Sequence, residues 1–183
     1  MNRRHVLKLT GGGLIMGAAL TFAPVNALAA MTAPASGARC LAFLNTHTGD
    51  RFSEAYWEGG AYLPGAMAEI KHVMRDHRSN ETHDIDPLLL DQLHGLNGLV
   101  GAAAPYEIIS GYRSPATNAM LHANSEGVAT HSLHMEGRAI DIRMQGVDLT
   151  RLRDAARSMN AGGVGYYQAS DFIHVDTGRV RRW

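Results

Sequence analysis

The sequence has few features that would cross-link it covalently or give it a strong charge. Cys40 is its single cysteine, so no disulfide can form within the chain. Arg39 stands where a lipoprotein signal needs a small residue, and we therefore expect Cys40 to be a partly buried apolar residue. Basic and acidic residues number 17 each. Because nucleic-acid-binding domains usually carry a basic excess, this balance predicts no nucleic acid partner.

No apolar run is long enough to predict a membrane span. The most hydrophobic stretch, residues 9–22, is short and rich in glycine. It follows Arg3 and Arg4 and leads to Ala27-Leu28-Ala29, the small-x-small pattern of a signal peptidase site. Residues 1–29 are therefore predicted to be an export signal, cleaved near Ala29 to release the protein into the periplasm with no membrane span.

The adjacent arginines resemble a twin-arginine signal, which implies the twin-arginine export machinery as a partner. An ordinary secretion signal that carries two arginines is the alternative. Residues 30–40 are rich in Ala, Pro, Ser and Gly and are expected to be a flexible lead-in. Residues 41–183 then have the length of one domain.

Hydrophobic periodicity within residues 41–183 predicts helices and strands in mixed order. The runs 41–47 and 51–57 alternate like strands and are separated by Thr48-Gly49-Asp50, a hairpin pattern. Asp86 followed by Pro87 predicts the start of a helix. Its expected buried stripe is Leu88, Leu89, Leu93, Leu96 and Leu99. Further helices are expected at 65–78, 115–124 and 148–160, and further strands at 106–110, 138–144, 164–167 and 172–175. Without a regular βαβ repeat, the pattern predicts an α+β domain with a small, mostly antiparallel sheet flanked by helices.

The residues with metal-binding chemistry lie in two short segments. Ser132 to Asp141 contains His134 and Asp141, and His174-Val175-Asp176 follows 33 residues later. Two histidines and one carboxylate are a ligand set that catalytic zinc uses, with the fourth position left to water. Alternation in the two predicted strands would place Asp141 and His174 side by side, while Gly137 would let the chain turn so that His134 reaches them. From spacing alone, structural histidines remain an alternative.

The same residues carry a resemblance to a known family. Ser132-x-His134-x-x-Gly137-x-Ala139-x-Asp141 followed by His174-x-Asp176 resembles the zinc D-Ala-D-Ala peptidase superfamily, and within it the YcbK-like murein endopeptidases. Matching blocks extend over nearly the whole chain. They include the twin-arginine start, Asn45 to Gly49, Ser110 to Ser114, Ala161 to Tyr167, and Arg182-Trp183.

The resemblance implies one Zn²⁺ per chain, with His134, Asp141 and His174 as its ligands. It implies Asp171 as the general base, which takes a proton from the attacking water. A turn residue that bonds backbone amides is the alternative for Asp171. The resemblance also implies that Arg113 lies beside the scissile carbonyl or a substrate carboxylate, where paired guanidinium donors bind an oxyanion. A surface arginine paired with an acid is the alternative.

Asp176 is expected to accept a hydrogen bond from a ligand imidazole and so fix its tautomer. A solvated carboxylate at a strand end is the alternative. Three more residues invite assignment but lie outside the motif, and we expect none of them to act in the site: His131, His122 and Glu136.

The function implied by the resemblance is hydrolysis of peptide cross-links in peptidoglycan. The bonds would be those between diaminopimelate residues, with D-Ala to diaminopimelate links as a second target. A carboxypeptidase that trims terminal D-Ala would use the same metal site and remains an alternative. A zinc-containing murein-binding module without catalysis is another, and an interaction protein with no metal is a third.

Overall fold

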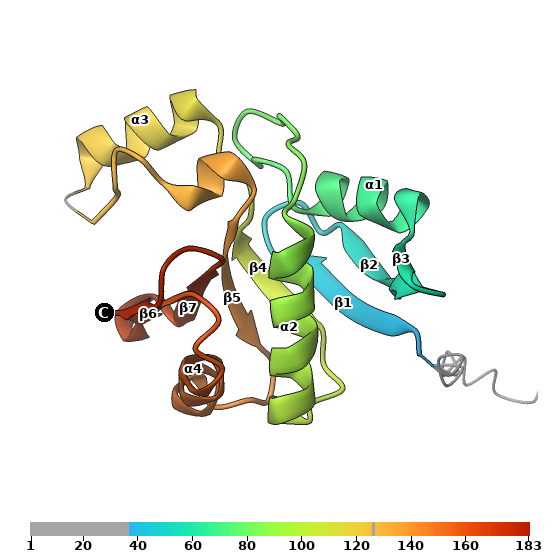
Figure 1. Cartoon of the computed structure of the whole chain (residues 1–183). Coiled ribbons are helices and arrows are strands. Elements are labelled where there is room, and N and C mark those ends of the chain that lie inside the picture. The colour runs from blue at the N-terminus through green and yellow to red at the C-terminus, as the bar shows by residue number, and fades with distance from the viewer. Residues whose placement is uncertain (1–36, 126) are drawn as a thin grey trace, which may run out of the picture. The chain divides into compact units, whose positions relative to one another are not determined.

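The computed structural model describes residues 37–125 and 127–183 of the chain. The strands within these residues form one mixed β-sheet (Figure 1). The strand order in the sheet is β3-β2-β1-β4-β5-β7-β6-β8. The strands are β1 (Arg39–Asn45), β2 (Arg51–Glu58), β3 (Ala61–Tyr62), β4 (Tyr106–Ser110), β5 (Ala139–Met144), β6 (Gly163–Tyr167), β7 (Phe172–Asp176) and β8 (Arg181–Arg182). The α-helices are α1 (Pro64–Val73), α2 (Pro87–Val100), α3 (Pro115–Asn124) and α4 (Leu149–Ser158).

Most neighbouring strands are antiparallel, as predicted. The exceptions are β1 beside β4 and β6 beside β8, which pair in parallel. The predicted hairpin is formed by β1 and β2. The α+β class is confirmed, and the described residues form a single domain. Strand β1 begins at Arg39, so it includes the last two residues of the expected lead-in 30–40, while the predicted signal 1–29 lies outside the described residues.

Two helices, the one predicted to start at Asp86-Pro87 and the one expected at 115–124, begin with a capping side chain followed by proline. The side chain of Asp86 accepts a hydrogen bond from the backbone N–H of Leu88 at the start of α2. Ser114 caps α3 by accepting from the N–H of Thr117. A proline follows each cap, where its missing N–H costs the helix nothing. None of the helices within 37–125 and 127–183 is long and apolar enough to cross a membrane.

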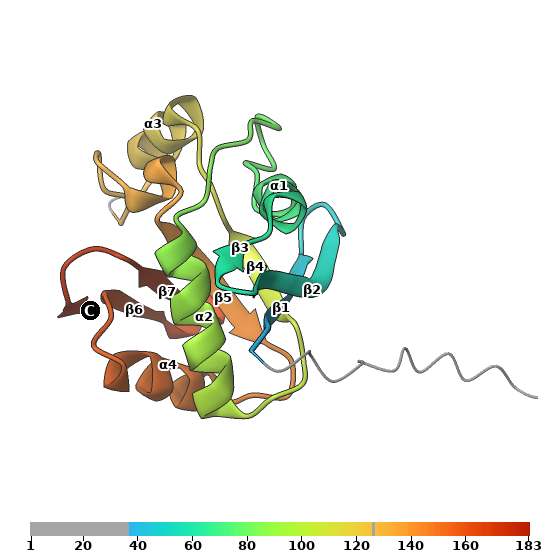
Figure 2. The same ribbon diagram turned by 45° about the vertical axis from the view of Figure 1, so that its right-hand side comes forward.

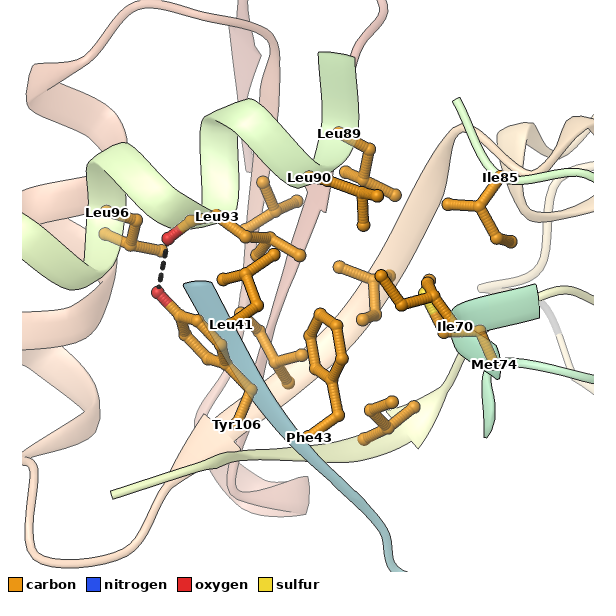
Figure 3. Close-up of a cluster of buried hydrophobic side chains, with 14 of the residues drawn as sticks. Leu41, Phe43, Ile70, Met74, Ile85, Leu89, Leu90, Leu93, Leu96 and Tyr106 are labelled. Atoms are coloured by element: carbon orange, nitrogen blue, oxygen red, sulfur yellow. Dashed lines mark hydrogen bonds between the residues drawn. The ribbon is translucent and has the colours of Figure 1, made fainter. Parts of the chain in front are cut away.

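The hydrophobic core lies between the sheet and helices α1, α2 and α4. Both ribbon views show α2 lying across the middle strands (Figures 1 and 2). Leucines of α2 pack there against Leu41 and Phe43 of β1 and Ile70 of α1 (Figure 3). The buried hydroxyl of Tyr106 donates to the backbone oxygen of Leu93, which ties β4 to α2.

The expected stripe of α2 was partly wrong. Leu88 is 63% exposed and Leu99 is 58% exposed, whereas Leu90 and Val100 are buried. At about 100° per residue, Leu90 and Val100 lie within about 60° of Leu93 on the helix surface, whereas Leu88 and Leu99 lie about 120–140° from it and so face solvent. The predicted helix is confirmed, but the expected stripe combined leucines from two of its faces, and only the face that includes Leu93 is buried.

Candidate metal centre

Two neighbouring strands hold the predicted carboxylate and one predicted histidine side by side. Asp141 of β5 lies directly opposite His174 of β7 in the antiparallel register. Ile140 and Ile142 alternate with Asp141 and are fully buried in the core. Asp141 and His174 therefore project from the other face of the sheet.

His134 reaches this pair from a short 3₁₀ helix, Leu133–Glu136. Gly137 ends that helix with φ at +65°, a conformation that favours glycine. A Cβ at Gly137 would also collide with the backbone oxygen of Asp84. The predicted chain reversal at Gly137 is therefore present, and it returns the chain to β5 with His134 over the sheet.

The three side chains present one ligand atom each to a common point. His174 Nδ1 lies 2.9 Å from Asp141 Oδ1, His134 Nε2 lies 3.2 Å from His174 Nδ1, and His134 Nε2 lies 3.3 Å from Asp141 Oδ1. Ligands about 2.0–2.1 Å from a tetrahedral zinc ion would be separated by about 3.3 Å. The donor types and their spacing therefore fit a zinc ion.

The outer nitrogen of each imidazole is already bonded. His134 Nδ1 lies 2.7 Å from the backbone oxygen of Gly111, which can only accept, so this nitrogen carries the proton. His174 Nε2 lies 2.9 Å from Asp176 Oδ2. With those nitrogens protonated, His134 Nε2 and His174 Nδ1 direct lone pairs toward Asp141. Three acceptors thus converge at one buried point, an arrangement that calls for a cation.

The electrostatics of the cluster point the same way. Burial opposes ionisation of Asp141, yet His134 and His174 beside it hold the pKa of its carboxyl well below the ordinary value. Burial alone would lower the pKa of His174, but hydrogen bonds to Asp141 and Asp176 raise it to about 8. In the metal-free cluster a proton on His174 is therefore the available cation, and a metal ion would have to displace it.

Asp176 supports His174 from behind and is itself fully buried. It accepts hydrogen bonds from the backbone N–H groups of Gly163 and Gly178, and from both terminal nitrogens of Arg181. Burial opposes its ionisation, but these contacts and the one with His174 hold its pKa well below the usual range. Asp176 is therefore a fixed, ionised acceptor for the His174 ring.

Arg113 lies beside the cluster, with its side chain 11% exposed. One terminal nitrogen lies 3.8 Å from Asp141 Oδ2 and 3.4 Å from Ser110 Oγ, and the other donates to Asn118 at 3.3 Å. Its buried Nε has no hydrogen-bond partner among the described residues. Burial lowers the pKa of the guanidinium, although it remains a cation. Arg113 is therefore a buried cation beside the cluster, and its Nε–H group has no acceptor among the described residues.

The loop that carries Arg113 is tied down on both sides. The N–H of Tyr112 donates to the backbone oxygen of Met74, and the N–H of Ser114 donates to Asp76. The N–H of Arg113 itself donates to the backbone oxygen of His134. The same loop thus positions the guanidinium and the Gly111 carbonyl that orients His134.

The structure does not bring Asp171 to the cluster. Asp171 follows a 3₁₀ turn with φ at +53°, and its side chain is 64% exposed. Its carboxylate accepts from Arg143 at 3.1 Å and lines a separate hollow with Glu107. Phe172 and His174 face the site because they alternate along β7, and the left-handed turn before Phe172 directs Asp171 elsewhere. This geometry differs from the general-base role expected of Asp171.

The cluster opens into a cavity of about 480 Å³. The three residues that the sequence analysis set aside are now placed. His131 lines this cavity, His122 instead contacts the backbone oxygen of Val128, and Glu136 pairs with Arg138. Of the two tyrosines in the matching block Ala161 to Tyr167, which could line a substrate groove or pack in the core, Tyr167 lines the cavity, as do Arg181 and Trp183, to which the sequence analysis gave no role. For Tyr167 the signal is the Gly163-x-Gly165-x-Tyr167 alternation of β6, which places Gly165 opposite His174 and Tyr167 on the same face.

Comparison with known proteins identifies the family of the chain. A family profile described as "Peptidoglycan L,D-endopeptidase MepK" matches residues 33–183. Proteins named peptidoglycan L,D-endopeptidase MepK from Escherichia coli K12 and Shigella flexneri are each 44% identical over 182 residues, which span 100% of this chain and 97% of the relative. A Haemophilus influenzae protein named probable peptidoglycan L,D-endopeptidase MepK is 40% identical over 183 residues, spanning 100% of this chain and 95% of the relative. The resemblance read from the motifs is thereby confirmed, and the chain belongs to the peptidoglycan L,D-endopeptidase MepK family of M15 metallopeptidases.

Proposed function

We propose that this protein is a zinc-dependent endopeptidase that hydrolyses peptide cross-links of peptidoglycan, with His134, Asp141 and His174 as the zinc ligands. The observation that carries the proposal is the convergence of three buried acceptor atoms at 2.9–3.3 Å, each oriented from behind or held by a neighbour. Zinc in such a site supplies Lewis acidity and a water with a pKa of about 7.

The remaining roles are assigned to residues of the cavity. Arg113 would hold the oxygen of the scissile carbonyl as negative charge develops on it, because it lines the cavity and one of its terminal nitrogens lies 3.8 Å from Asp141 Oδ2. Among the described residues that line the cavity, Asp141 is the sole carboxylate, and it belongs to the ligand set. We therefore assign proton transfer to His131, the lining imidazole outside that set, in place of Asp171.

For the substrate bond, we propose the link between two diaminopimelate residues, with the D-Ala to diaminopimelate link as a second target. Support for the first target comes from the family description and from the names of the three relatives, which are L,D-endopeptidases, while the second target, a D,D bond, rests on the motif resemblance.

The proposed location is the periplasm, reached through the signal in residues 1–29. Cell fractionation of a variant with Arg3→Lys and Arg4→Lys tests the twin-arginine route, and unchanged periplasmic protein would contradict it.

The function is tested with purified domain and defined muropeptides. Zinc is measured by elemental analysis, and cross-linked dimers and uncross-linked stems are digested separately. We expect one zinc per chain and conversion of dimers to monomers with free stems intact. His174→Ala should abolish both zinc and cleavage, while His122→Ala, a histidine outside the cluster, should retain both. Release of terminal D-Ala alone would establish the carboxypeptidase, and zinc without any cleavage would establish a binding module.

A further inference from the structure

One wall of the cavity is aromatic and is formed by side chains of β6, of β7 and of the residue that follows β8. Tyr167 of β6 stacks on Phe172 of β7, with ring centroids 4.7 Å apart and planes within 20°. The indole of Trp183 lies with its centroid 5.3 Å from that of His174. All three aromatic rings line the cavity that contains the cluster. This wall therefore adjoins the ligand His174 directly.

The place of Trp183 depends on Gly165. Gly165 is the register partner of His174 on the neighbouring strand. A Cβ there would collide with the indole ring, so any other residue would displace it. The backbone of Trp183 pairs with β6 through Val164 and Tyr166, and the Arg181 guanidinium covers the indole at 4.9 Å. The position of the indole is therefore fixed by the backbone hydrogen bonds of Trp183 and by the Arg181 guanidinium that lies over the ring.

The fixed indole orients the hydroxyl of Tyr167. Trp183 Nε1 donates to the Tyr167 oxygen at 2.8 Å. An indole nitrogen is a donor only, so Tyr167 cannot return its own proton along this contact. Within the described part of the chain, the Tyr167 hydroxyl makes no hydrogen bond other than the one it accepts from Trp183. The phenol O–H is thus left to donate to whatever lies in the cavity.

We propose that Tyr167 is a substrate-contacting residue, which donates its O–H to a carbonyl or carboxylate oxygen of the bound peptide, and that Trp183 positions this hydroxyl. The inference deepens the proposed function and rests on it for the identity of the peptide. Arg113 and Tyr167 line the same cavity and would share the binding of substrate oxygens. A donor whose orientation is set before binding loses little entropy when the substrate arrives.

Tyr167→Phe removes the donor and keeps the ring on Phe172. We expect kcat/KM on cross-linked dimers to fall about 30-fold or more, since loss of one oxyanion donor costs about 10²–10³ in rate. A fall in kcat identifies the developing oxyanion as the acceptor, whereas a rise in KM identifies a ground-state oxygen. Tyr166→Phe is the matched control, because its hydroxyl lies 3.4 Å from Thr150 Oγ1, and its rate should stay within about twofold.

Trp183→Phe tests the positioning role because it removes the N–H and keeps an aromatic ring over Gly165. We expect a loss of about fivefold in kcat/KM, and the double variant with Tyr167→Phe should be no slower than Tyr167→Phe alone. Losses that multiply in the double variant would mean that Trp183 acts structurally and would overturn that assignment. Zinc content and melting temperature are measured on each variant to confirm that the fold is retained.

Binding of an uncross-linked tetrapeptide stem, measured by calorimetry, separates this inference from the proposed function. If the wild type binds the stem at least threefold more tightly than Tyr167→Phe does, the contact stands even where no hydrolysis is found. If wild type cleaves dimers and Tyr167→Phe matches it in both kinetics and stem binding, the inference is overturned while the zinc endopeptidase stands.

Discussion

At the scale of single residues, the geometry separates two groups that the motif places together. His174 is three residues after Asp171, yet the two side chains lie in different hollows of the surface. The ion pair of Asp171 with Arg143 joins partly exposed side chains, and such pairs contribute about 0–1 kcal/mol to stability. His131 is less conspicuous in sequence but lines the cavity of the cluster.

This contrast predicts unequal effects of two substitutions. Asp171→Asn should change kcat by less than about threefold and leave zinc and melting temperature nearly unaltered. His131→Gln should retain zinc but lower kcat by about 10²-fold, which is within the usual range for loss of a general base. Steady-state kinetics on cross-linked dimers, with zinc analysis, measures both. The reverse order of effects would return the proton-transfer role to Asp171.

At the scale of elements, the loop Gly111–Ser114 depends on the buried Asp76. Asp76 accepts from the backbone N–H groups of Arg78 and Ser114, and so joins the end of α1 to the start of α3. Burial alone would raise its pKa, but the hydrogen bonds from Thr117, Ser114 and Arg78 hold the pKa well below the ordinary value. The carboxylate therefore stabilises the loop only while it is ionised.

Asp76→Asn should consequently lower the free energy of unfolding at neutral pH by about 1–3 kcal/mol, the usual cost of a buried group left without its partner. Because the folded-state pKa is depressed, the contribution of Asp76 is complete above its unfolded pKa of about 3.9 and is lost as the pH falls below that value. Urea unfolding between pH 7 and pH 3 measures this effect. The gap between wild type and variant should narrow in acid, and a constant gap would contradict the assignment.

At the scale of the whole molecule, the three proposed ligands come from β5, β7 and the 3₁₀ helix before β5. These segments are joined in space by the sheet, so an ion that binds all three favours the folded state alone. Metal binding is then linked to global stability.

Removal of zinc with a chelator should therefore lower the melting temperature. At a free zinc concentration 100 times Kd the stabilisation is about 2.7 kcal/mol, which corresponds to about 5–10 °C for a domain of this size. Differential scanning calorimetry with and without chelator measures the shift. His174→Ala should show no chelator effect, and a wild-type protein equally indifferent to the chelator would count against a structural contribution of the metal.

The sequence by itself determined the features that depend on neighbours along the chain. The caps at Asp86 and Ser114, the β1–β2 hairpin and the pairing of alternating faces in β5 and β7 all follow from local conformational rules. The family motif marked His134, Asp141 and His174, and the structure brings them together within 4.8 Å.

Only the tertiary structure decided which other side chains share the site. The pairing of Asp171 with Arg143, the position of Trp183 over Gly165 and the choice of which face of α2 is buried each depend on contacts between segments distant in sequence. A periodic pattern specifies which way a side chain points from its own element. What it then meets is set by strand register and by the space its neighbours leave, and these are properties of the packed chain.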